Sequence, residues 1–141
     1  MIKSIAEILK EISKEKSFNT RVEMLKKNDS FAMRTLLQGT FDPRIEFDLP
    51  DTDPPYKPTE MLDQQGHLYQ QARKFPIWVK GQQENLPKFK KEQLFIELLE
   101  SIDPEDAKLV LAMKNKQNPL PNITPKLVLA VWPGLFPEET K

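Results

Sequence analysis

The chain contains no cysteine and a single histidine, His67, among its 141 residues. Without cysteine it cannot form disulfides, thiolate metal sites or a cysteine nucleophile, and one histidine argues against a histidine-rich metal centre or a Ser-His-Asp triad. The four glycines are scattered, so no glycine-rich phosphate loop is present. No apolar run approaches the ~20 residues of a membrane span, and charged residues interrupt the N-terminus, unlike a signal peptide. These absences favour a cytoplasmic protein without a metal or cofactor.

The chain also lacks net charge, because 21 basic side chains balance 21 acidic ones. This balance argues against a simple polycationic DNA-binding protein. The charges are nevertheless segregated. Residues 41–63 hold 2 basic and 7 acidic groups, 64–91 hold 6 and 1, 92–106 hold none and 6, and 107–126 hold 4 and none. Residues 1–34 hold 8 basic and 5 acidic groups. Either the folded surface has one basic and one acidic face, or the oppositely charged segments pair with each other.

Most of the chain has the apolar spacing of amphipathic helices. Helix-start signals stand at Ser30, at Asp103 before a proline, and at Thr124 before another proline. Gly39 is a reasonable stop for the third helix, and Trp132-Pro133-Gly134 for the last. The sequence therefore predicts an all-α, single compact domain over 1–141 with about six to seven helices. They are expected over 2–15, 18–27, from 31 to about 39, 59–75, 87–102, from 104, and from 125, with Phe31 and Phe89 among the inward-facing residues.

Residues 40–58 differ from the rest. Ile45, Phe47 and Leu49 alternate with polar residues at the period of a strand, and four prolines lie between 50 and 58. A helix is excluded here. We expect an extended, proline-rich excursion anchored by Phe41, Ile45 and Phe47, with a two-stranded ribbon as one option.

Lysines supply the candidate binding residues. Lys88, Lys90 and Lys91 crowd the first turn of one helix, where acidic residues are preferred. They could meet an anion, or their aliphatic stems could cover apolar surface. Thr124 and Lys126 begin the last helix, where the amides of 126 and 127, the helix dipole and the lysine charge would favour a phosphate. An ordinary capped helix is the alternative.

The C-terminal segment carries a family resemblance. Val131-Trp-Pro-Gly-Leu135 followed by Pro137-Glu138 resembles the close of the all-helical N-terminal DNA-binding domain of ATP-dependent DNA ligases, especially the T-even bacteriophage type. The segments 8–12, 24–28, 31–37 and 103–116 are similar in pattern to other helices of that domain.

The resemblance implies a module that holds duplex DNA by its phosphates without reading sequence. By position it implies Thr124 and Lys126, with Lys114 and Lys116 upstream, as phosphate contacts. The loop 118–122 departs from the family, because it contains two prolines where ligases have glycine and small hydroxyl residues. The chain has no Lys-x-Asp-Gly adenylation motif. We therefore expect a non-enzymatic, stand-alone DNA-binding accessory protein of bacteriophage type, acting in the host cytoplasm in replication, repair or transcription.

Two alternatives remain open from the sequence. The chain could be a protein-interaction adaptor or inhibitor that kept the ligase-domain fold, with a sliding clamp, a polymerase subunit or a host enzyme as partner. The excursion 42–58 and a free Phe136 tail would then be the contact surfaces. It could also be one half of a split ligase that is completed by a separate catalytic chain.

Overall fold

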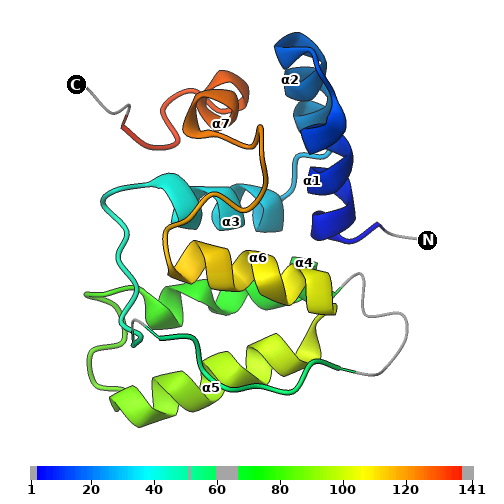
Figure 1. Ribbon diagram of the computed structural model, residues 1–141. Coiled ribbons are helices and arrows are strands. Elements are labelled where there is room, and N and C mark those ends of the chain that lie inside the picture. The colour runs from blue at the N-terminus through cyan, green and yellow to red at the C-terminus, as the bar shows by residue number, and fades with distance from the viewer. Residues whose placement is uncertain (1–2, 51, 60–66, 138–141) are drawn as a thin grey trace.

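The computed structural model describes residues 3–50, 52–59 and 67–137, and these form an all-α domain (Figure 1). Its elements, including one 3₁₀ helix (η1), are α1 (Ile5–Lys14), α2 (Phe18–Lys27), α3 (Phe31–Phe41), α4 (His67–Gln71), η1 (Ala72–Trp78), α5 (Lys88–Ser101), α6 (Pro104–Lys114) and α7 (Pro125–Val131). No helix in this part of the chain is both long and apolar enough to cross a bilayer. The predicted all-α class is confirmed.

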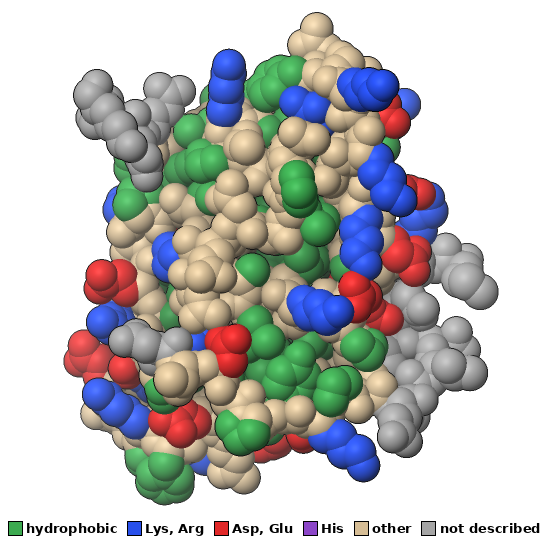
Figure 2. Space-filling view, viewed as in Figure 1, with side chains coloured by type: hydrophobic (Ala, Val, Ile, Leu, Met, Phe, Trp, Pro, Cys, Tyr) green, Lys and Arg blue, Asp and Glu red, His purple; other side chains and the backbone are tan. Residues whose placement is uncertain are grey.

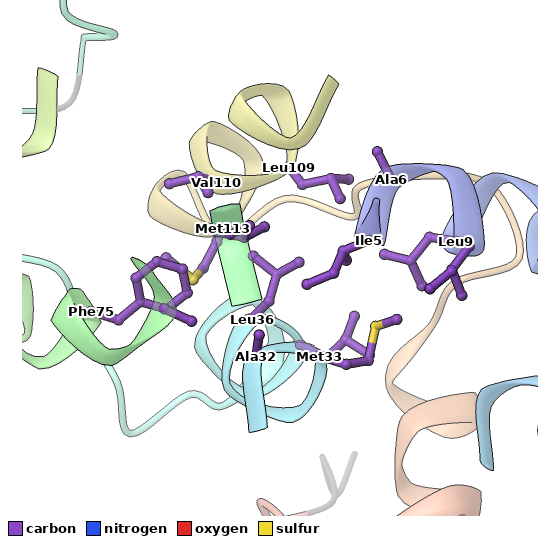
Figure 3. Packing of buried hydrophobic residues seen from close by; sticks show 14 of the residues in the cluster. Ile5, Ala6, Leu9, Ala32, Met33, Leu36, Phe75, Leu109, Val110 and Met113 are labelled. Carbon is purple, nitrogen blue, oxygen red and sulfur yellow. The ribbon is translucent and has the colours of Figure 1, made fainter. Parts of the chain in front are cut away.

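Helices α3 and α6 form the centre of the domain. Figure 3 shows Leu36 of α3 and Met113 of α6 facing each other, with Ile5 of α1 and Phe75 of η1 packed beside them. All four side chains are at most 2% exposed. Helix α7 packs on α2 at one end of the molecule, and α5 lies at the opposite end (Figure 1). The two ends therefore present different sets of side chains.

The predicted helix starts are confirmed. The Ser30 hydroxyl accepts a hydrogen bond from the Met33 amide at 3.1 Å, and an Asp103 carboxylate oxygen accepts one from the Glu105 amide at 3.0 Å. These side chains satisfy backbone donors that have no partner within the helix. Gly134 has a φ of 82°, which gives the left-handed turn expected after α7.

Gly39 does not end the third helix, contrary to the sequence prediction. The helix continues to Phe41, and Gly39 lies inside it against α6. A Cβ atom on Gly39 would lie 2.8 Å from the Met113 sulfur. This glycine therefore permits close approach of two helices. Residues 60–66, the first part of the helix predicted over 59–75, lie outside the described residues.

Two aromatic residues predicted to face inward are exposed. Phe31 is 54% exposed and Phe89 is 72% exposed. Both stand in the first turn of their helices. The inward-facing stripe of each helix is formed by other residues at helical spacing, including Leu36 in α3 and Phe95 in α5. Apolar character alone did not place them in the stripe.

Residues 42–50 and 52–58, here called the strap, run without helix as predicted. A single antiparallel bridge joins Phe47 to Val79, where the Asp48 amide donates to the Trp78 carbonyl at 2.6 Å and the Lys80 amide to the Glu46 carbonyl at 2.8 Å. Within the described residues, this single bridge is all that forms of the expected two-stranded ribbon.

Candidate nucleic-acid interface

The lysines Lys88 and Lys90 start α5 at one end of the molecule. Helix α5 follows Pro87 without a side-chain cap and has no acidic residue in its first turn. Lys88 is exposed and Lys90 is half-buried, on either side of the exposed Phe89. Neither lysine forms an ion pair with a described carboxylate. Both remain accessible to solvent.

Lys91 is buried and binds the strap to α5 through an ion pair. Its ammonium lies 2.9 Å from an Asp48 carboxylate oxygen, and its side chain is only 3% exposed. Its carbonyl accepts a hydrogen bond from the Trp78 indole N–H at 2.8 Å. The hydrogen bond from Lys91 is the main cause that lowers the pKa of Asp48 below its usual value. Lys91 is therefore not available to a phosphate.

Lys114 makes a second contact with the strap, from the end of α6. Its ammonium donates to the Pro50 carbonyl at 2.8 Å and to the Thr52 carbonyl at 3.3 Å, and lies 3.5 Å from the Asp53 carboxylate. The neighbouring Asn115 amide donates to Asp53 at 2.9 Å. The end of α6 thus holds the proline-rich part of the strap.

Lys116 makes a third internal contact. Its ammonium donates to the Gly39 carbonyl at 2.6 Å and the Asp42 carbonyl at 2.8 Å, and lies 5.7 Å from the centre of the Phe47 ring. Burial lowers the pKa of Lys116, against the raising effect of Asp42 and Glu46. It therefore satisfies carbonyls at the end of α3, where a cation suits the helix dipole.

The charge segregation of the sequence is resolved by these contacts. The acidic segment 41–63 receives Lys91 and Lys80 from the basic segment 64–91, and Lys114 from 107–126. Lys10 of the first segment contacts Glu105 at 2.6 Å. Oppositely charged segments pair with each other, which was the second of the two interpretations.

Thr124 and Lys126 keep only part of their predicted arrangement. The Thr124 hydroxyl caps α7 by accepting from the Leu127 amide at 3.2 Å, so one of the two amides expected to face an anion is occupied. Helix α7 runs only from Pro125 to Val131, and Pro125 at its first position has no amide to donate to an anion. The Lys126 side chain is exposed, with its ammonium 5.5 Å from the centre of the Phe18 ring.

The seven predicted residues therefore do not line one face. Lys91, Lys114 and Lys116 are engaged internally, while Lys88 and Lys90 on α5 lie at the opposite end of the molecule from Lys126 on α7 (Figure 1). The reason is tertiary. Aliphatic stems let lysines at helix ends reach carboxylates and carbonyls of the strap.

The fold brings other basic residues to Lys126. The Ser13 hydroxyl donates to the Pro121 carbonyl at 2.5 Å, and the Asn122 amide donates to the Ser13 carbonyl at 2.9 Å. These bonds tie the end of α1 to the loop before α7. Lys14 and Lys16 are exposed at that end of α1. The backbone from which they project is therefore held against the loop that precedes α7.

Arg21 completes this group from α2. Its guanidinium lies 5.8 Å from the centre of the same Phe18 ring that Lys126 approaches. It donates to the Glu15 carbonyl at 2.7 Å and to the Lys16 carbonyl at 3.3 Å, and the side chain is half-buried. We call Lys14, Lys16, Arg21 and Lys126 the Phe18 basic cluster. Across 3–50, 52–59 and 67–137, no carboxylate forms an ion pair with any of the four. Figure 2 shows Lys and Arg side chains over the α2 end of the visible face.

Sequence reasoning missed three members of the cluster. The excess of basic groups in residues 1–34 was the available signal. Their meeting with Lys126 depends on a contact between segments about a hundred residues apart.

No arrangement of three or more His, Asp or Glu side chains that could hold a metal ion occurs within the described part of the chain. Among curated proteins, none matches this sequence. A family model does match, over residues 8–119, which span α1 from its fourth residue to the end of α6. The chain belongs to this family of unknown function, DUF6433.

Proposed function

We propose that this protein is a non-enzymatic domain that binds duplex DNA through phosphate contacts made by the Phe18 basic cluster. The observation that carries the proposal is the gathering of four cations, from α1, α2 and α7, without a described carboxylate paired to them. Lys14, Lys16 and Lys126 are exposed, and exposed cations release DNA counterions on binding, a contribution that does not depend on DNA sequence. The ligase-like segment 131–138 at the end of α7 supports the same conclusion.

Several acidic residues are already paired within the chain and add little negative field at the basic cluster. Asp42, Asp48 and Asp53 are each within ion-pair distance of an arginine or lysine of the same chain, and Glu105 is paired with lysines of α1 and α6. Zero net charge is therefore compatible with a local basic surface. Lys26 and Lys27 extend that surface along α2.

The expected affinity is modest. With about four to five phosphates neutralised, log K should fall with log salt with a slope of about −4, and Kd should be in the micromolar range at low salt. Sequence-independent binding follows, because phosphate contacts position a protein on DNA and do not read bases.

The test is a fluorescence-anisotropy titration of a labelled duplex over a series of salt concentrations. Lys14→Glu with Lys126→Glu should weaken binding at least about tenfold and reduce the slope by about 2. The matched control is Lys88→Glu with Lys90→Glu, which changes the same charge at the α5 end and should leave the affinity within about twofold. Equal losses in the two variants, or no binding by the parent chain at low salt, would overturn the proposal.

A further inference from the structure

A groove lies beside α7, bounded by the start of α2, the end of α3 and the C-terminal segment. It has a volume of about 560 Å³ and is formed by Phe18 of α2, Phe41 of α3, Lys126, Leu129 and Ala130 of α7, and Phe136. Three other cavities among the described residues are smaller, at about 170, 280 and 150 Å³. Its size is within the ~300–1,000 Å³ typical of ligand-binding pockets.

The groove is a consequence of how the C-terminal segment folds back. Phe136, expected to be a free tail, is only 4% exposed, and its ring centre lies 6.4 Å from that of Phe41. The Gln38 amide and the Arg44 guanidinium both donate to the Leu135 carbonyl, at 3.3 Å and 3.5 Å. The returning segment therefore forms a wall that faces α7.

The outer face of α7 contributes apolar side chains to this groove. Leu127 and Val128 point into the core and are fully buried, while Leu129 is half-buried and Ala130 is exposed. Figure 2 shows hydrophobic side chains at the surface of the α7 end. Aromatic and aliphatic walls of this kind accept a bulky apolar side chain.

Among the described residues that line the groove, Lys126 is the only charged one. Arg21 approaches the Phe18 ring, which forms part of the same lining. A ligand that combines an apolar anchor with carboxylates would bury the anchor and place its charges next to these cations. A basic ligand would be repelled.

We infer that this groove is a docking site for an acidic protein segment that carries one or more bulky apolar side chains. The apolar residue enters between Phe18 and Phe136, and an adjacent carboxylate meets Lys126. This site goes beyond the proposed DNA contact and shares only Lys126 with its cluster, so an acidic segment and DNA compete for the same lysine.

The probe is a library of short random peptides displayed on phage and selected against the full chain. The enriched peptides should combine Leu, Ile, Phe or Trp with flanking Asp and Glu, and the strongest should be synthesised for titration. Enriched peptides that are basic or that lack a bulky apolar residue would overturn the inference. So would no enrichment at all, or nucleic acid as the only ligand that occupies the groove.

Three variants separate this site from the DNA contact. Ala130→Trp fills the groove at an exposed position without changing charge, so it should weaken the peptide at least about tenfold and leave DNA affinity unchanged. Lys126→Glu should weaken both ligands, and Lys14→Glu should weaken DNA with little effect on the peptide. Peptide binding that survives both Ala130→Trp and Lys126→Glu would refute the assignment, whatever the DNA titration gives. Thermal unfolding of each variant should match that of the parent chain.

Discussion

The sharpest prediction concerns Asp106, a buried carboxyl between α1 and α6. The residue is fully buried, and one of its oxygens accepts a hydrogen bond from the Ala6 amide at 2.8 Å. The other oxygen has no hydrogen-bond partner. Burial is the main cause that raises its pKa to about 7, opposed by the Ala6 hydrogen bond and assisted by the nearby charges of Asp103, Glu7 and Glu105.

The sign of the pH dependence follows from this raised pKa. Between the unfolded value near ~4 and the folded value of about 7, the folded chain binds a proton that the unfolded chain has lost. Stability therefore falls as pH rises through this window, by about 1.4 kcal/mol per pH unit. From about pH 5 to about pH 8 the loss attributable to Asp106 is about 3 kcal/mol.

Asp106→Asn should remove this dependence. The amide oxygen can still accept from Ala6, but its NH₂ group replaces the oxygen that lacks a partner, which costs about 1–3 kcal/mol at every pH. The variant should be less stable than the parent at about pH 5 and should equal or exceed it at about pH 8. Below this window, the lowered pKa values of Asp42, Asp48 and Glu105 give the opposite slope in both proteins.

The assay is urea unfolding followed by far-UV circular dichroism at several pH values between these limits. The difference between the two proteins isolates Asp106, because all other titratable groups are common to both. Stability curves that run parallel within about 0.5 kcal/mol across the window would show that Asp106 is ionised in the folded protein and would refute the reasoning.

Three further outcomes are expected, each measured by urea unfolding at neutral pH. Lys91→Ala should lower the free energy of unfolding by about 3 kcal/mol because it leaves Asp48 without its partner. Replacing both residues, as Lys91→Met with Asp48→Leu, should recover most of this loss. An equal loss in the single and double variants would contradict the ion pair. Phe136→Ala should cost about 3 kcal/mol, and no loss would mean that the returning segment does not pack in solution. Lys88→Glu with Lys90→Glu should change stability by less than about 0.5 kcal/mol, and a larger loss would show that these side chains have structural contacts.

Local signals predicted local structure well. The caps at Ser30, Asp103 and Thr124 mark the starts of α3, α6 and α7, and the prolines after residue 50 keep the strap out of helix. These features depend on neighbouring residues, so a sequence carries them directly. Gly39 misled for the opposite reason, because its role is set by Met113, which lies far along the chain.

The candidate site could be predicted only in part. Lys126 was found from its place at a helix start, and it is exposed beside Phe18. Nothing in the sequence distinguished Lys91 and Lys114 from Lys88 as candidate phosphate contacts. In the structure, however, Lys91 and Lys114 bind the strap. A lysine does not indicate in advance whether a carboxylate will fold onto it, because that partner comes from a distant segment.

The sequence by itself determined an all-α domain, its helix starts and its one extended segment, since periodicity and capping act within a few residues. Only the tertiary structure decided which charges cancel and which remain. The strap takes up Lys91, Lys114 and Lys116, while Lys14, Lys16 and Lys126 stay exposed and the Ser13 contact holds the end of α1 against the loop before α7. Long side chains and non-local contacts are the physical reason, because they join residues that no sequence spacing relates.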